Sequence, residues 1–219
     1  AHAVSAAAAI ATWMTQPPFA PYRALLAALL EAERYDLLLD SFYRVLPFGT
    51  GGRRGPVGLG PNRINPYTLG TSVQGNIDFM RDRFGARAPL SVVIAADVRV
   101  FRDLRGAFPT DVANPLLGMT SVDLSMQAAG IFARNGVDVF MARPGDGRFV
   151  STPELSFLIR QLGAQGGLNV SASHNHPDDN GGKFYTELGA QETPPDDERM
   201  VERVAAVERV DGWTFDEAV

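Results

Sequence analysis

Most of the side chains that could do chemistry lie in one stretch, residues 168–183. An apolar run stops at Ser173, His174 follows directly, and Asp178 and Lys183 come next. A serine hydroxyl is a weak nucleophile unless a base or a fixed positive charge assists it, and the imidazole of His174 and the amine of Lys183 are candidates for both roles. This pattern favours a nucleophilic or phosphate-carrying serine.

Two other interpretations of the same stretch stay open. Asn, Asp, Pro and Gly are typical of turns, so the segment could be a solvated surface loop without a chemical role. Alternatively, His174, His176 and Asp178 resemble part of the His-x-His-x-Asp-His pattern of metallo-hydrolases. A catalytic zinc site more often needs a third histidine or an equivalent ligand, and the remaining histidine of the chain is His2.

A glycine-rich segment over residues 49–60 is the second candidate for a binding site. It lacks the Gly-Lys-Ser/Thr of a P-loop and the third glycine of a dinucleotide-binding fingerprint. One interpretation is a flexible connector. The other is a phosphate site, because glycines frame Arg53 and Arg54 and would bring backbone N–H groups and guanidinium groups together.

The rest of the chain predicts the elements that position these segments. Apolar positions at helical spacing predict helices that start near Ala6 and over residues 21–45 (broken near Tyr35), 67–83, 121–134, 152–165 and 196–209. Short β-branched runs predict strands over residues 90–96, 137–142, 167–172 and 183–185. This alternation predicts an α/β fold, a three-layer domain with a mixed, mostly parallel sheet of about four strands flanked by helices, plus an N-terminal helical extension.

Ligands of such sheets gather beyond the carboxyl ends of the strands. Asp97 and Ser173 each follow a predicted strand, so we expect both to line the same edge of the sheet.

Composition excludes several classes of function. The net charge of −5 and the lack of a Lys/Arg run argue against a nucleic-acid partner. The 219 residues include no cysteine, which excludes disulfides and a cysteine nucleophile and fits a reducing cytoplasm, the expected location. No run approaches the roughly 20 apolar residues that a membrane span needs, so no membrane contact is expected.

Four motifs together resemble those of the phosphohexomutase superfamily, the phosphoglucomutases and phosphomannomutases. Ser171-Ala-Ser-His-Asn175 resembles the family's phosphoserine signature, (Thr/Ser)-Ala-Ser-His-Asn-Pro, with His176 in place of Pro. The following Asn180-Gly-Gly-Lys183 matches Asn-Gly-x-Lys. Two upstream segments also match: Phe48–Gly55 resembles Phe-Gly-Thr-x-Gly-x-Arg-Gly, and Asp97-Val-Arg99 resembles Asp-x-Arg.

The resemblance implies a phosphosugar mutase that moves a phosphoryl group between C1 and C6 of a hexose phosphate, through a phosphoserine and a bisphosphate intermediate. Ser173 would carry the phosphoryl group, His174 would support it, and Lys183 would be the general base. Arg54, Lys183 and Asn175 would bind phosphate. Mg²⁺ would contact this chain through the phosphate of Ser173 and be held mainly by another domain, and a hexose bisphosphate would serve as activator.

The resemblance covers only the first of the family's four domains. It divides the chain into an N-terminal helical extension (1–46), a phosphoserine-bearing domain (47–195) and a helical tail (196–219) that leads toward a missing second domain. A fragment of this kind is expected to be inactive alone, with a sugar phosphate and the remaining mutase domains as partners. A phosphopentomutase-type enzyme, a non-catalytic sugar-phosphate-binding module and a metallo-hydrolase are the alternatives.

Overall fold

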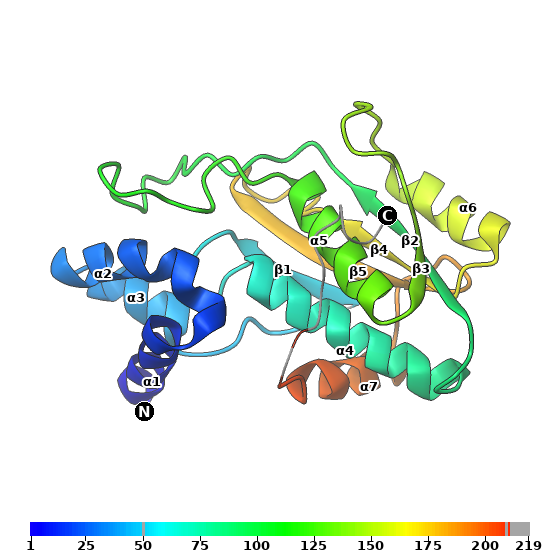
Figure 1. Ribbon diagram of the computed structural model, residues 1–219, viewed down its shortest axis with the longest axis horizontal. Coiled ribbons are helices and arrows are strands. Elements are labelled where there is room, and N and C mark those ends of the chain that lie inside the picture. Colours follow the sequence, from blue (N-terminus) through cyan, green and yellow to red (C-terminus); the bar gives the residue numbers. More distant parts are fainter. Residues whose placement is uncertain (50, 209, 211–219) are drawn as a thin grey trace.

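The protein, as a computed structural model that describes residues 1–49, 51–208 and 210, is built around one mixed β-sheet (Figure 1). Its strands are β1 (Gly52–Pro56), β2 (Leu90–Ala96), β3 (Val137–Met141), β4 (Gly166–Val170) and β5 (Asp179–Thr186). They lie in the order β1-β5-β4-β2-β3. The predicted α/β class is confirmed, with a sheet of five strands rather than about four.

The pairing of the strands explains the extra one. β2 is parallel to both β3 and β4, whereas β5 is antiparallel to β4 and to β1. β1 comes from the glycine-rich segment, which looked like a loop because the residues of the strand itself, 52–56, include no β-branched side chain. It pairs with an equally glycine-rich part of β5, and a Cβ atom at Gly52 would collide with the backbone of Gly182. Close approach of two backbones, rather than side-chain packing, therefore makes this edge strand.

The helices largely follow the predicted boundaries. They are α1 (His2–Thr15), the 3-10 helix η1 (Pro17–Tyr22), α2 (Arg23–Glu31), α3 (Tyr35–Phe42), α4 (Pro66–Phe84), α5 (Ser121–Arg134), α6 (Thr152–Leu162) and α7 (Asp196–Ala205). The predicted break in the second helix lies just before Tyr35, where Glu33 has a φ of 54°. The helix predicted over 196–209 ends at Ala205, and residue 209 lies outside the described residues.

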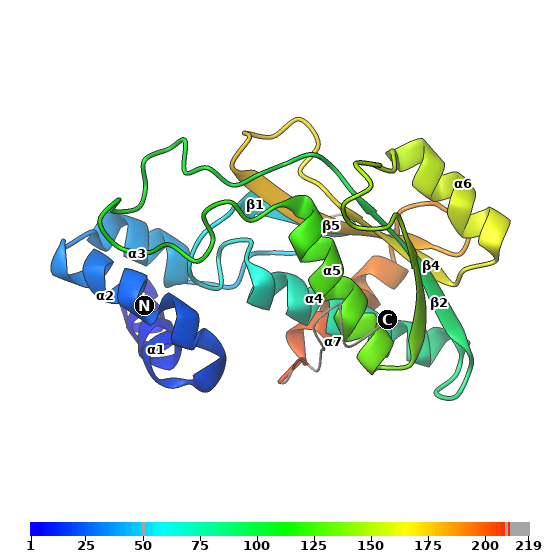
Figure 2. The same ribbon diagram turned by 45° about the horizontal axis from the view of Figure 1, so that its top comes forward.

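Helices cover the two faces of the sheet unequally. α4 and α5 join Val92 and Ile94 in the main core, whereas α6 packs with Val93 and Ala95 on the opposite face. β2 is therefore buried on both sides, which explains its continuous apolar run. Figure 2 shows α6 at the β2–β4 side of the molecule, away from β1.

Two further parts pack against this central unit. The helical extension forms an aromatic cluster around Trp13 and docks through an ion pair between Asp40 and Arg63. α7 lies against α4, where Gly75 leaves no room for a Cβ atom beside Val204. Within the described ranges, no helix combines the length and apolar character that a membrane crossing requires. The domain boundaries drawn from the sequence stay a prediction, and residues 211–219 of the tail lie outside the described part.

Candidate active site

The topology creates one switch point in the sheet. The chain leaves β2 through α5 to reach β3 on one side, and then passes through α6 to β4 on the other side of β2. Ligands of open α/β sheets bind at the carboxyl ends of the strands at such a point. Asp97 and Ser173 follow the two strands that meet here, and both line one cavity of about 430 Å³. The expectation that they share an edge is confirmed.

Ser173 is exposed and holds an unusual backbone conformation. Its φ of 54° is left-handed, a region that residues other than glycine rarely adopt. Its N–H donates to Oγ of Ser171 at 2.9 Å, which helps to hold the turn, and its own Oγ lies 3.4 Å from Nδ1 of His174. Strained residues of this kind cluster at functional sites. The structure thus places Ser173 and His174 together, as the sequence predicted.

Arg99 organises the loop that carries Ser173. Its guanidinium donates hydrogen bonds to four backbone carbonyls of that loop: Ser173 (2.6 Å), Asn175 (3.1 Å), His176 (2.7 Å) and Asp179 (3.1 Å). Asp97 holds the same guanidinium at 3.2 Å and also accepts from Oγ of Ser121. The sequence motif contained Asp97 and Arg99, yet the predicted set of site residues omitted both.

Arg54 and Lys183 lie on the same face of the sheet, because Gly52 pairs with Lys183 and Arg54 pairs with Gly181 on the neighbouring strand. Burial, followed by repulsion from Arg54, lowers the pKa of Lys183. Nε of Arg54 is buried and has no hydrogen-bond partner in the described part of the chain. A guanidinium beside an amine forms a cationic patch suited to phosphate.

The Ser173 loop lies close to this patch. Lys183 pairs with Asn169 of β4, four residues before Ser173. Those four residues span at most ~14 Å even when fully extended. Lys183 is also the only lysine in the sequence, against 19 arginines, so the one amine side chain of the protein lies here.

Arg53 does not share this face. Its side chain is 7% exposed and donates to the carbonyl oxygen of Thr68 and to the hydroxyls of Thr71 and Ser72, at 3.2 to 3.3 Å. Burial lowers its pKa to about 10. Of the two arginines that the glycines frame, only Arg54 is placed to meet a surface ligand, and the phosphate-binding role considered for Arg53 is wrong.

Other polar residues of the loop hold its shape. The amide of Asn175 donates to Asp179 at 3.1 Å, and Asp179 also pairs with Arg105 at 2.7 Å. Nδ1 of His176 accepts from the backbone N–H of Asp178 at 3.1 Å. No cluster of three His, Asp or Glu side chains able to hold a metal ion occurs among the residues that the structure describes. The metal interpretation of His174, His176 and Asp178 therefore finds no support in their placement.

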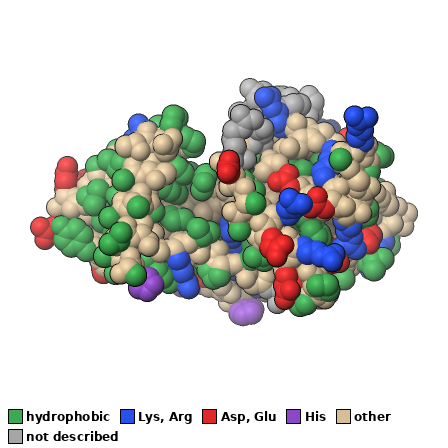
Figure 3. All heavy atoms as spheres, turned by 90° about the horizontal axis from the view of Figure 1, so that it is seen from below, with side chains coloured by type: hydrophobic (Ala, Val, Ile, Leu, Met, Phe, Trp, Pro, Cys, Tyr) green, Lys and Arg blue, Asp and Glu red, His purple; other side chains and the backbone are tan. Residues whose placement is uncertain are grey.

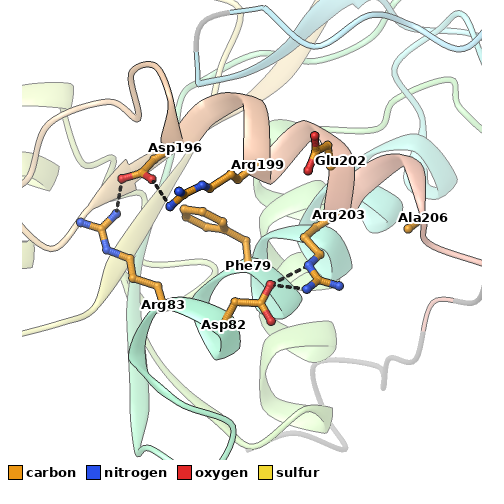
Figure 4. A pocket seen from close by; sticks show the side chains of 8 residues that line it. All are labelled: Phe79, Asp82, Arg83, Asp196, Arg199, Glu202, Arg203 and Ala206. Atoms are coloured by element: carbon orange, nitrogen blue, oxygen red, sulfur yellow. Dashed lines mark hydrogen bonds and ion pairs between the residues drawn. The ribbon is translucent and has the colours of Figure 1, made fainter.

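A larger cavity, of about 760 Å³, lies between α4 and α7 (Figure 4). Five of its six charged side chains form ion pairs with one another: Asp82 with Arg203 at 2.6 Å, and Asp196 with both Arg83 (3.6 Å) and Arg199 (3.3 Å). Charged side chains of both signs gather on this half of the molecule (Figure 3). The cavity shares no lining residue with the one beside Ser173, and its paired charges make it a weaker candidate for an anionic ligand.

Comparison with known proteins points to one family. The family model for phosphoglucomutase/phosphomannomutase, alpha/beta/alpha domain I, matches residues 119–211, which include Ser173 and Lys183. The chain is 33% identical over 167 residues to a phosphoglucomutase of Staphylococcus saprophyticus, covering 76% of this chain and 26% of the relative. It is 29% identical over 185 residues to a phosphopentomutase of Mus musculus, covering 84% and 27%.

The fold gives an independent match. A crystal structure described as a phosphomannomutase from Thermus thermophilus superposes with a TM-score of 0.55 at 24% identity, covering 77% of this chain and 31% of that one. The chain thus spans about a quarter of the length of the curated relatives it matches. The domain-I match, the similar mutases and the shared fold all agree with the motifs around Ser173, and the chain belongs to the phosphohexomutase superfamily.

Proposed function

We propose that this chain supplies the phosphoserine part of a phosphosugar mutase site, in which Ser173 accepts and returns the phosphoryl group. The observation that carries the proposal is the placement of Ser173 at the switch point of the sheet. The hydroxyl is exposed on a loop that Arg99 fixes, and the chain's only lysine lies on the adjacent strand. Phosphoryl transfer requires positioning and charge neutralisation above all, and these residues could provide both.

The transfer can be written with this chain's own groups. A sugar hydroxyl attacks the phosphorus of phosphorylated Ser173, the new sugar O–P bond forms, and the bond from phosphorus to Oγ breaks. The amine of Lys183 takes the proton that the hydroxyl loses and passes it to the departing Oγ. In the second half of the cycle Oγ of Ser173 returns that proton to Lys183 as it attacks the other phosphate of the bisphosphate. The bond from that phosphorus to the sugar oxygen breaks, and Lys183 gives the proton to the released sugar oxygen.

Charge decides which residues assist. A phosphoserine carries about −1.5 to −2 at neutral pH. Arg54 offers a buried Nε without a partner in the described part, which suits a phosphate oxygen. Lys183 can act as a base only if its pKa falls, and both burial and Arg54 lower it. His174, at 3.4 Å from Oγ of Ser173, would orient the hydroxyl. Asn175 would act through Asp179 and the shape of the loop, because its amide donates there.

Mg²⁺ is the expected cofactor of this chemistry, but the described residues include no cluster of three His, Asp or Glu side chains that could hold it. Around the Ser173 loop, Asp97 pairs with Arg99 and Asp179 pairs with Arg105. Oδ1 of Asp178 accepts from the N–H of Arg102, whereas its Oδ2 is buried without a hydrogen-bond partner in the described part. The phosphate of Ser173 is the one ligand that this chain would offer to the ion.

The test uses the mass of the intact chain. Incubation of the chain, joined to the remaining mutase domains and supplied with Mg²⁺, with glucose 1,6-bisphosphate is expected to add one phosphate, about 80 Da, to the wild type and to Ser5→Ala, which changes an exposed serine of α1. Ser173→Ala should add none. Ribose 1,5-bisphosphate as donor distinguishes a phosphopentomutase-type preference. Binding of either donor without a mass increase would contradict the mutase proposal and favour a sugar-phosphate-binding module.

A further inference from the structure

We propose that Gln191 is the positioning residue for Lys183, and that its neutral carbonyl fixes the amine without locking it as an ammonium ion. Nζ of Lys183 donates to Oε1 of Gln191 at 2.8 Å, and both side chains are half-buried. The inference rests on the proposed function, because the position of the amine matters only if Lys183 exchanges a proton with the sugar.

The backbone fixes Gln191 where this contact requires it. After β5 the chain turns at Gly189 and folds back along the strand: the N–H of Thr186 donates to the carbonyl oxygen of Ala190 at 2.7 Å, and Tyr185 pairs with Gln191. The return segment thus runs beside the strand that carries Lys183. Its place is set by main-chain hydrogen bonds and does not depend on the side chain of Gln191.

The turn before β1 packs against the segment that carries Gln191. Gly51 has a φ of 65°, and a Cβ atom built there would lie 3.5 Å from Cβ of Gln191 and 3.6 Å from the nitrogen of Glu192. The carbonyl oxygen of Gly51 accepts from the N–H of Phe184 at 2.7 Å. The turn that leads to Arg54, the strand of Lys183 and the segment of Gln191 therefore form one packed unit.

The charge of the acceptor is the second part of the argument. Burial and Arg54 both lower the pKa of Lys183. A carboxylate within about 4–6 Å would oppose both effects and raise a pKa by about 1 to 3. The next residue, Glu192, carries such a group, but its carboxylate contacts Arg83 on α4 at 3.5 Å. An amide faces the amine, and the neighbouring acid is engaged elsewhere.

The single lysine makes a direct test possible on this chain. Amine-specific reagents can modify only Lys183 and the N-terminal amine, which serves as an internal reference. We expect Gln191→Glu to raise the pKa of Lys183 and to slow its modification near pH 8 at least tenfold, since an increase of 1 in pKa lowers the neutral-amine fraction tenfold. Gln161→Glu, which adds the same charge on the exposed side of α6, should leave the rate unchanged.

A second variant tests position rather than charge. Gln191→Met keeps the size but removes the acceptor, and we expect the ¹⁵N-detected Nζ signal of Lys183 to broaden through faster proton exchange while the circular dichroism stays that of the folded chain. Wild-type modification rates in Gln191→Glu, or a sharp Nζ signal in Gln191→Met, would overturn the proposal. Neither readout needs phosphoryl transfer. If the variants change the amine of Lys183 as expected but Ser173 accepts no phosphate, the proposal for Gln191 stands and the proposed function is refuted.

Discussion

The guanidinium of Arg99 donates to the carbonyl oxygen of Ser173 at 2.6 Å, so the segment that follows β2 holds the backbone of the residue proposed to carry phosphate. Three further carbonyl oxygens accept hydrogen bonds from Arg99, and the carboxylate of Asp97 forms an ion pair with its Nε. A loop whose carbonyl groups converge on one cation has its geometry determined by that cation. Arg99 is thus a structural requirement of the site even though it is not proposed to touch the substrate.

Arg99→Lys is expected to loosen the loop without unfolding the domain. An ammonium group cannot reproduce the planar fork of donors, and hydrogen bonds to charged groups are each worth about 1.5–3 kcal/mol. We expect the free energy of unfolding to fall by about 2–3 kcal/mol in a urea titration, and the amides of residues 173–179 to exchange faster. Arg87→Lys, on the exposed segment before β2, is the control. Unchanged exchange in the loop would show that Arg99 does not hold it.

The left-handed backbone of Ser173 gives a second prediction. Glycine adopts this region freely, whereas a Cβ atom there costs about 1–2 kcal/mol. Ser173→Gly should therefore be more stable than Ser173→Ala by about 1 kcal/mol, in a comparison of thermal unfolding. The same comparison at Ala206, with a right-handed φ of −84°, should give the opposite order, with Gly below Ala. Equal stabilities of the two Ser173 variants would mean that the turn is not strained.

How much of this could be predicted depended on the kind of signal in the sequence. The buried strand over residues 90–96 and the helix over 121–134 were predicted with the bounds that the structure shows, because apolar spacing defines them directly. β1 was missed because its pairing depends on glycines of a strand more than 120 residues away. Long-range backbone contact leaves no periodic pattern in the local sequence.

The candidate site shows the same division. Local motifs identified Ser173, Lys183 and Arg54. They could not show that Arg53 and Arg54 point to opposite faces of the sheet, because both belong to a strand that had not been predicted. Gln191 carries no motif of its own in the single sequence. Its importance appears only when the chain folds back beside β5 and brings its amide to Lys183.

Arg54→Met should weaken binding of a phosphate ligand. Methionine keeps much of the apolar volume but removes the guanidinium, whose Nε lacks a partner among the described residues. Because a charged hydrogen bond contributes about 1.5–3 kcal/mol, we expect affinity for glucose 1-phosphate, measured by NMR titration, to fall tenfold or more. Arg87→Met removes an exposed guanidinium outside the site and should bind as the wild type does. An unchanged affinity in Arg54→Met would return this segment to the role of a connector.

Glu192 should make the stability of the domain depend on pH. Burial raises its pKa to about 7, although Arg83 opposes this effect. Between the ordinary glutamate pKa of 4.5 and about 7, the folded chain binds more protons at this group than the unfolded chain does. The contribution of Glu192 to stability therefore falls as pH rises through that window. Urea titrations at several pH values should show a smaller fall in Glu192→Gln, which stays neutral, than in the wild type. Glu202→Gln, an exposed position on α7, should keep the wild-type dependence. The same slope in Glu192→Gln as in the wild type would mean that this carboxyl group ionises normally in the folded chain.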